Sequence, residues 1–204
     1  MTPRGEKLNE QMRKEAMTKI TKAALEVFAE YGYHGATINQ IKQVSGLSKG
    51  LVYHYFPSKE KIFFHLVETA LKISRSIWLE ALKSPGTAWQ KIESISEALV
   101  KHAFSDDNSL YFLIMMQALT QGKSIPGLLE YIWENSAHYN ELPKLIVEAQ
   151  MSGEVVQGDP EVLTTSYFAL FQGYTLILLH DKELKKRLTP ETFTRILRKE
   201  RINT

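Results

Sequence analysis

Apolar residues recur at steps of three and four along nearly the whole chain, which is the spacing of one face of a helix. In residues 16–31 these apolar side chains fall on one side of a helix, which Gly32 and Gly35 then end. No segment shows sustained alternation of apolar and polar residues, and no Asn-Gly or Asp-Gly hairpin turn is present. The pattern therefore predicts eight to ten helices and no sheet.

Two short helices are predicted between residues 37 and 56. Thr37 and Gln40 have the spacing of a capping box, which starts a helix ending at about Ser45. Gly46 makes a turn, and Ser48 is the N-cap of a second helix that runs to about Phe56. The apolar residues expected to fix the two helices against the first helix are Ile38, Ile41, Val44, Leu47 and Val52.

Further helix starts follow at Ser58, Thr87, Asp159 and Thr189. Residues 110–119 are apolar nearly all round, as in a helix buried within a bundle. Residues 128–152 read as one helix, with Pro143 as a kink or interruption. The chain is thus predicted to be all-α, with an N-terminal domain of three helices and a larger C-terminal helical bundle.

The glycine turn between two short helices has the geometry of a helix-turn-helix, whose second helix enters the major groove of DNA. Ser48, Lys49 and Gly50 stand at the N-terminus of that helix, where backbone N–H groups and a lysine attract phosphate. Gly50 costs about 1 kcal/mol of helix propensity, which makes sense if the backbone must approach a groove wall closely. The predicted DNA-contacting residues are Thr37, Ser48, Lys49, Gly50, Tyr53, His54 and Lys59.

The run from Phe28 to Ile38, together with Ile41, the segment from Gly46 to Phe56 and Ser58-Lys59-Glu60, resembles the N-terminal domain of the TetR family of bacterial transcriptional regulators. The close match covers about residues 16–66, near a quarter of the chain. The resemblance implies a helix-turn-helix DNA-binding domain at 1–66 and a helical ligand-binding and dimerisation domain at 67–204. It also implies a homodimer on a palindromic double-stranded operator, released by a small molecule that binds the C-terminal domain. Repression is the family tendency.

The chain departs from the family pattern in the first helix of the motif, where Lys42 and Ser45 replace alanines that many relatives carry. At position 42 we expect the lysine stem to extend out of a packed site, with a phosphate contact as the alternative. Tyr55 and Phe56 are expected to serve the core of the domain rather than the DNA.

Charge and composition narrow the function further. The 204 residues hold 25 basic and 23 acidic side chains, of which ten and six lie in residues 1–65, giving +4 there and −2 in the remainder. Cysteine is absent, which excludes thiol catalysis, cysteine-bound zinc and disulfides. No apolar stretch reaches the roughly 18 residues that a membrane span needs, so a soluble cytoplasmic protein without membrane association is expected.

Enzyme motifs are incomplete in this chain. Gly122-Lys123-Ser124 lacks the first glycine of a phosphate loop, because position 117 is glutamine. His65 and Glu68 have no second histidine at zinc-protease spacing, and no Gly-x-Ser-x-Gly elbow occurs. We therefore expect no catalytic residues, no metal and no cofactor.

Two sets of residues in the C-terminal part are candidates for interaction. A stripe of small and medium side chains on the helix of residues 160–180 predicts a symmetric four-helix interface between two subunits, with packing inside one subunit as the alternative. The stripe and its partners on the last helix are Val162, Ser166, Ala169, Gly173 and Leu176, with Phe193, Ile196 and Leu197. Aromatic and methionine residues could line a pocket for an apolar effector, although core packing is the simpler interpretation of each one.

The candidate ligand-binding residues are His102, Phe112, Met115, Met116, Trp133, Tyr167, Phe171 and Tyr174. The same crowded set also includes Trp78, Trp89, Phe104, Tyr111 and Tyr139. Two alternatives to an effector-controlled regulator stay open at this stage. One is an architectural DNA-binding protein without an effector, and the other is a helical small-molecule-binding protein whose N-terminal motif is vestigial.

Overall fold

A computed structural model describes residues 3–103, 106–178 and 181–199. Within these residues the chain forms eleven α-helices and two 3-10 helices. The only β-type pairing among them is one isolated antiparallel bridge between Val155 and Arg198. The all-α prediction is confirmed. Phe104 falls outside the described residues. None of the described helices combines the length and apolarity needed to cross a membrane.

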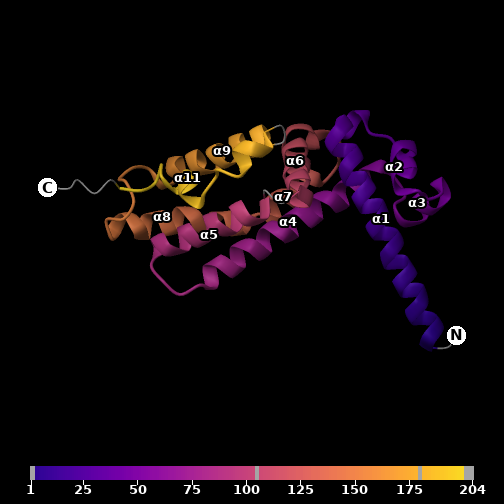
Figure 1. Ribbon diagram of the computed structural model, residues 1–204, viewed down its shortest axis with the longest axis horizontal. Coiled ribbons are helices and arrows are strands. Elements are labelled where there is room, and N and C mark those ends of the chain that lie inside the picture. The colour runs from indigo at the N-terminus through magenta and orange to yellow at the C-terminus, as the bar shows by residue number, and fades with distance from the viewer. Residues whose placement is uncertain (1–2, 104–105, 179–180, 200–204) are drawn as a thin grey trace. The chain divides into compact units, whose positions relative to one another are not determined.

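The helices group into two compact units (Figure 1). The first unit comprises residues 1–70 and 113–130, and the second comprises residues 71–112 and 131–204. Residues 113–130 therefore pack with the N-terminal helices, whereas the sequence groups them with the C-terminal domain. The functional division at 66/67 remains a prediction.

The first unit holds α1 (Pro3–Gly35), α2 (Ile38–Ser45), α3 (Lys49–Tyr55), the start of α4 (Lys59–Lys83), the end of α6 (Asp106–Gln121), η1 (Gly122–Ser124) and the start of α7 (Leu128–Asn135). Figure 1 shows α2 and α3 side by side next to α1. Helix α1 is interrupted at Gly32, whose φ of 69° and ψ of 170° are non-helical, so the predicted stop at this glycine is confirmed. The core of the unit includes the fully buried Phe28, Ile41 and Val52.

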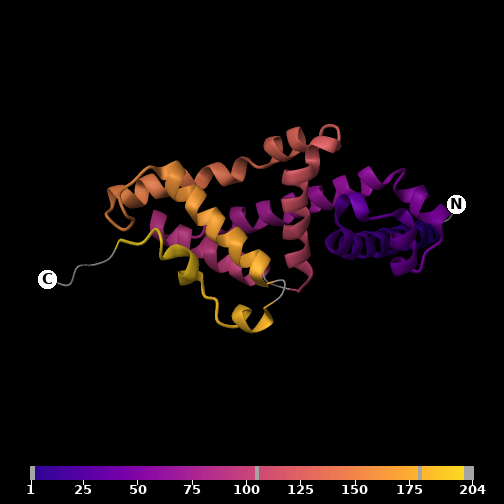
Figure 2. The ribbon, with the colours of Figure 1, turned by 90° about the horizontal axis from the view of Figure 1, so that it is seen from above.

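The second unit holds the rest of α4, α5 (Ala88–Ala103), most of α7, η2 (Ala137–Asn140), α8 (Glu141–Met151), α9 (Pro160–Leu178), α10 (Lys182–Lys185) and α11 (Pro190–Thr194). Helices α5, α8, α9 and α11 gather into one bundle (Figures 1 and 2). Large side chains fill the centre of the bundle, among them Trp78, Ile92, Tyr167 and Phe193. Burial of this apolar surface is the main stabilising term for the unit.

Three expectations about local structure were wrong. Val44, expected in the core, is 51% exposed. Each step of three residues falls about 60° short of a full helical turn, so Val44, two steps after Ile38, lies about 120° away from it around the helix and off the buried face. Lys42 is exposed rather than emerging from a packed site. The expected helix over 128–152 is broken at 136–140 and not at Pro143, because proline is tolerated in the first turn of α8.

Candidate nucleic-acid interface

Helix α2 is fixed at its N-terminus by the predicted capping box. Thr37 Oγ1 accepts from the backbone N–H of Gln40 at 3.3 Å, and Gln40 Oε1 accepts from the backbone N–H of Thr37 at 2.8 Å. Thr37 Oγ1 also lies 2.7 Å from Gln40 Oε1, so the hydroxyl hydrogen is already donated within the cap. Thr37 is exposed, but its first role is to start α2 in the correct direction.

The turn and the cap of α3 follow from single residues. Gly46 ends α2 in the left-handed conformation, with φ of 68°, and donates its N–H to the carbonyl of Lys42. Ser48 then caps α3 by accepting the N–H of Leu51 at 3.2 Å. Val52 is fully buried and fixes α3 against the unit. These contacts confirm the predicted helix-turn-helix.

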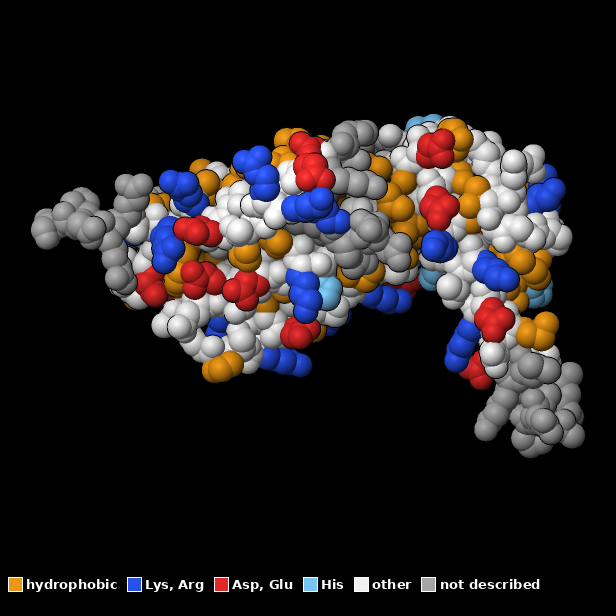
Figure 3. Space-filling model, viewed as in Figure 1, with side chains coloured by type: hydrophobic (Ala, Val, Ile, Leu, Met, Phe, Trp, Pro, Cys, Tyr) orange, Lys and Arg blue, Asp and Glu red, His pale blue; other side chains and the backbone are white. Residues whose placement is uncertain are grey.

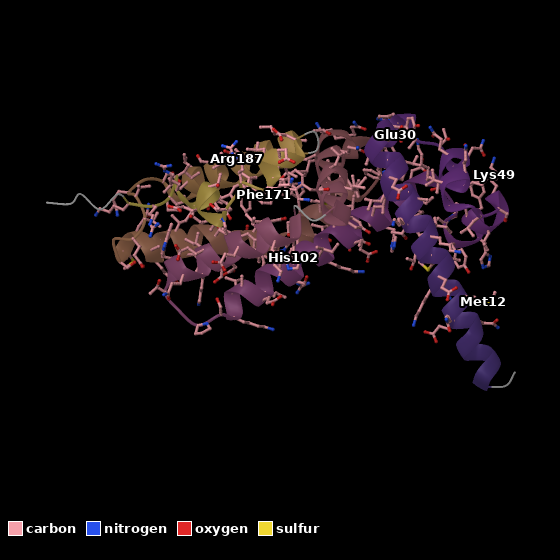
Figure 4. All side chains as sticks on the ribbon, in the orientation of Figure 1. Met12, Glu30, Lys49, His102, Phe171 and Arg187 are labelled. Atoms are coloured by element: carbon pink, nitrogen blue, oxygen red, sulfur yellow. The ribbon has the colours of Figure 1, made fainter. Side chains whose placement is uncertain are left out.

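The opposite face of α3 is open to solvent. Ser48, Lys49, Gly50, Tyr53 and His54 are all exposed. The Lys49 ammonium lies 5.9 Å from the centre of the Tyr53 ring, and Figure 4 shows Lys49 on the outer side of α3, away from α1. A cation, a tyrosine hydroxyl and an imidazole thus occupy the surface of one helix, a combination suited to phosphate oxygens and base edges.

Gly50 has no structural requirement within the chain. A Cβ built at this position would meet nothing within 4 Å, and its backbone does not adopt positive φ. The absent side chain therefore leaves open space next to Lys49. Such space favours the close approach of a second molecule to the backbone of α3.

The structure corrects the role predicted for Lys59. Its ammonium donates to the backbone carbonyls of Tyr33 at 2.8 Å, Ala36 at 3.0 Å and His34 at 3.4 Å. It also lies 4.8 Å from the centre of the Tyr33 ring. Since an ammonium has three N–H donors, these carbonyls occupy all of them, and Lys59 joins the end of α1 to the start of α4 instead of pointing at a phosphate.

A hydrogen bond next to Lys59 strengthens the same junction. The Tyr33 hydroxyl donates to Glu60 Oε1 at 3.3 Å, and Tyr33 packs against the rings of Phe28 and Phe63. Burial, followed by the charge of Glu60, raises the pKa of Tyr33 to about 12, so the hydroxyl stays protonated and remains a donor. Nothing in the local sequence indicated this junction, because its partners are more than twenty residues apart.

The candidate ligand-binding residues are dispersed in the structure. Tyr167 is fully buried, lies with its hydroxyl 2.8 Å from Ser96 Oγ, and has its pKa raised to about 12 by burial. Phe171 contacts Phe112 and Phe193 with ring centres 5.9 and 5.4 Å apart. Tyr167, Phe171 and Phe193 belong to the core of the second unit, and Phe112 packs against it.

The other candidates occupy separate places. Tyr174 is half-buried against Phe193, and His102 is half-buried in the last turn of α5. Met115 and Met116 are half-buried on the part of α6 that belongs to the first unit. The side chain of Trp133 is 71% exposed, so core packing, the simpler interpretation of this residue, was wrong.

The exposed face of α9 agrees with the predicted stripe, and of the three predicted partners Phe193, Ile196 and Leu197 only Ile196, which is 39% exposed, does so as well. Val162 is 61% exposed, and Ser166, Ala169 and Leu176 are also exposed. Phe193 and Leu197 are fully buried within the subunit, so their assignment to an interface was wrong. They face inward because α11 packs against α5 and α9.

Comparison with known proteins agrees with the helix-turn-helix geometry. Residues 20–66 match the family model described as bacterial regulatory proteins, tetR family. The chain belongs to the TetR family. The match covers α2 and α3 entirely, together with the adjoining parts of α1 and α4.

Relatives of this TetR-family protein are transcriptional regulators. The regulator RutR of Escherichia coli K12 is 29% identical over 157 residues, which cover 76% of this chain and 71% of RutR. The repressor AcnR of Corynebacterium efficiens is 37% identical over 60 residues, or 29% of this chain and 32% of AcnR. A proposed regulator from Saccharomonospora viridis in complex with choline shares the fold at a TM-score of 0.71 and 19% identity, covering 92% of this chain and all of that one.

The TetR-family protein is therefore a DNA-binding transcriptional regulator, and its helix-turn-helix is the DNA-binding element. The sequence identified the exposed face of α3 correctly. It did not identify the cluster of Ser74, Trp78, His138 and Tyr139 in the second unit, because residues more than sixty positions apart meet there.

Proposed function

We propose that this TetR-family regulator is a cytoplasmic repressor that binds a palindromic operator as a homodimer and dissociates when its second unit binds a small apolar molecule. The observation that carries the proposal is the division of α3 into a buried side at Val52 and an exposed side at Lys49, Gly50, Tyr53 and His54. A short helix held from one side can enter a major groove without rearrangement of the unit.

The contacts proposed with DNA follow the exposed residues. Lys49 and the N-terminus of α3 face the phosphate backbone. Thr37 acts through the cap of α2 instead, because its N–H and its hydroxyl hydrogen are both donated to Gln40 Oε1. Tyr53 and His54 face the base edges. Lys59 is removed from this set, because its ammonium is bound to carbonyls of the chain. On the face of the second unit that Figure 3 shows, acidic and basic side chains are intermixed, which offers no continuous basic surface for DNA.

Dimerisation is supported by apolar side chains that are exposed on two adjacent helices. Helix α9 presents Val162, Ala169 and Leu176, and α8, which packs against it, exposes Val147 and Met151. Met151 is 84% exposed, an unfavourable state for a large apolar side chain unless another surface covers it. A second copy of the chain supplies such a surface, and small residues on α9 allow the helices to approach closely.

Repression is supported by the match to AcnR, which is named a transcriptional repressor. Control by an apolar effector is supported by the aromatic core of the second unit, to which charged residues do not contribute within the described part of the chain. Such a core favours apolar ligands.

Selection of duplexes from a random pool by the full-length protein tests the proposal. We expect enrichment of a two-fold-symmetric site, with half-sites separated by about one helical turn of DNA. Sedimentation at micromolar concentration should give twice the 23.4 kDa of the single chain. A monomer, or a selected pool without symmetry, would contradict the homodimer on a palindrome.

Two substitutions then separate phosphate contacts from base contacts on the selected operator. Lys49→Met should weaken binding to all duplexes and reduce the slope of log affinity against log salt by about 0.9, as the loss of one phosphate contact does. His54→Ala should change which operator is preferred. Equal weakening on all operators would remove His54 from the base contacts.

The two alternative functions give different results in the same assays. An architectural protein would bind duplexes with little sequence preference and without release by any small molecule. A binding protein with a vestigial motif would show no salt-dependent affinity for any duplex.

A further inference from the structure

A cluster of polar and aromatic side chains is buried where three elements of the second unit meet. Helix α4 contributes Ser74 and Trp78, one turn apart, η2 contributes His138 and Tyr139, and α9 contributes Phe168. The ring of Trp78 lies 5.5 Å from that of Tyr139 and 6.1 Å from those of His138 and Phe168. Tyr139 and Phe168 contact each other edge to face at 5.2 Å, so the rings form one continuous group.

Some polar atoms of the cluster satisfy one another. The Ser74 hydroxyl oxygen lies 2.8 Å from the Tyr139 hydroxyl and 3.1 Å from His138 Nε2. Trp78 is different, because it is fully buried and its indole N–H has no acceptor among the described residues. Thr164, one turn before Phe168 on the inward side of α9, is also buried, and its hydroxyl has no partner there.

His138 Nδ1 is a third buried atom of this region without a partner, and the ring carries its proton there when Nε2 accepts from Ser74. All three groups can then donate a hydrogen bond. An indole N–H is only a donor, and a threonine hydroxyl can donate or accept. Leaving such donors buried without a partner is unfavourable, and most buried polar groups in proteins have one. A ligand that satisfies these groups must therefore supply a hydrogen-bond acceptor, such as an oxygen, and need not supply a donor.

The cluster also lacks a full charge. Burial, followed by the nearby charge of Arg75, lowers the pKa of His138 to about 4, so the imidazole is neutral near pH 7. Arg75 itself is exposed, and no Asp, Glu, Lys or Arg is part of the core around Trp78 within the described residues. An anionic ligand group would lose its hydration here and gain only the charge of Arg75, which is exposed and screened by water.

We propose that the Trp78 cluster is the subsite for the polar group of the effector, and that this group is an uncharged acceptor such as a ketone, ester, lactone or amide carbonyl on an apolar body. The carbonyl oxygen accepts from the Trp78 indole, and Thr164 is the second donor. A ligand reaches Trp78 past Tyr139 and Phe168, which are the partly exposed rings of the group. This assignment rests on the proposed function, since it classifies the effector named there.

Acetophenone and ethylbenzene test the subsite, because they share one shape and differ by a carbonyl in place of a methylene. Binding of each to the full-length protein is measured by titration, together with the indole N–H signals of its three tryptophans. We expect acetophenone to bind about tenfold more tightly than ethylbenzene. We also expect acetophenone to move the Trp78 indole proton downfield and ethylbenzene not to do so.

Three variants identify the donor. Trp78→Phe keeps an aromatic ring and removes the N–H, so it should lower the affinity ratio of the two probes from about ten to about three, the share left to Thr164, without weakening ethylbenzene. Trp89→Phe, which alters another buried tryptophan of the same core, should leave the ratio unchanged. Thr164→Val removes the second donor at nearly constant volume and should reduce the ratio by about threefold, which keeps the test valid if Trp78→Phe does not fold.

Several results would overturn the assignment. These are equal binding of acetophenone and ethylbenzene, no binding of either, or an unchanged ratio in Trp78→Phe. Stronger binding of benzoate would assign the site to an anion, and stronger binding of choline would assign it to a quaternary cation. A Trp78 indole proton that already has the shift of a hydrogen bond and moves with no probe would assign the acceptor to a buried water.

None of these measurements uses DNA. A protein that selects a symmetric operator but shows none of these responses refutes the subsite alone. A protein that shows the responses but selects no operator refutes the proposed function and leaves the subsite intact.

Discussion

Replacing Lys59 by methionine tests the junction between α1 and α4. The substitution keeps an unbranched apolar stem and removes the ammonium that donates to three carbonyls, at 2.8, 3.0 and 3.4 Å. Tyr33 and Ala36, which carry the two closer carbonyls, are buried, so these oxygens lose partners that water replaces only in part. The contact of the ammonium with the Tyr33 ring at 4.8 Å is lost as well.

These losses set the magnitude. A hydrogen bond from a charged donor contributes about 1.5–3 kcal/mol, and a cation–π contact at a partly exposed site about 0.5–1 kcal/mol. Because Lys59 is half-buried and one ammonium serves all three carbonyls, we expect a total loss of about 2–3 kcal/mol in unfolding free energy. For a chain of this length that corresponds to a melting temperature lower by roughly 4–10 °C.

The assay joins thermal melting with the salt dependence of operator binding. Lys59→Met should lower the melting temperature and leave the slope of log affinity against log salt unchanged. Lys49→Met, the matched exposed lysine, should do the opposite, with a slope smaller by about 0.9 and an unchanged melting temperature. Should Lys59→Met lower the slope as Lys49→Met does, with no effect on melting, the ammonium would contact phosphate and the junction would be refuted.

Three further predictions concern α3, α9 and the Trp78 cluster. Gly50→Ala should raise the unfolding free energy of the free protein by about 0.5–1 kcal/mol, because the added Cβ meets no atom of the chain, and it should weaken operator binding. Urea unfolding measures the first effect and fluorescence anisotropy the second. Unchanged operator binding would refute the close approach of DNA. Ala169→Glu should convert the dimer to a monomer in sedimentation without loss of helicity, whereas a dimer that persists would exclude α9 from the interface. The pKa of His138 is about 4 in the folded chain and 6.5 ordinarily, so between these pH values only the unfolded chain takes up the proton, and the free energy of unfolding should fall as pH decreases from 6.5 to 4. His138→Gln should flatten this pH profile of stability. An unaltered profile would show that His138 does not cause the fall.

Local signals in the sequence were sufficient for the DNA-binding element. The capping box at Thr37, the turn at Gly46 and the N-cap at Ser48 depend on residues within four positions of each other, and all three appear as predicted. The burial of Val52 and the exposure of Lys49 follow from helical periodicity over one short helix.

Expectations that depended on distant contacts were less accurate. Lys59 was assigned to a flanking phosphate because it stands at the start of the helix that follows the motif, but residues 33–36 provide carbonyls that the sequence does not place near it. Trp133 was assigned to the interior because tryptophan is usually buried, whereas α7 turns it outward. The Trp78 cluster joins residues separated by about ninety positions, so its unpartnered donors become visible only in three dimensions.

The way in which α3 is held has a consequence for how such regulators evolve. One inward side chain, Val52, and one cap, Ser48, maintain the helix, while the neighbouring outward positions contribute little to folding. Mutations at those outward positions can therefore accumulate and redirect the protein to new target genes, one substitution at a time, without passing through an unstable intermediate.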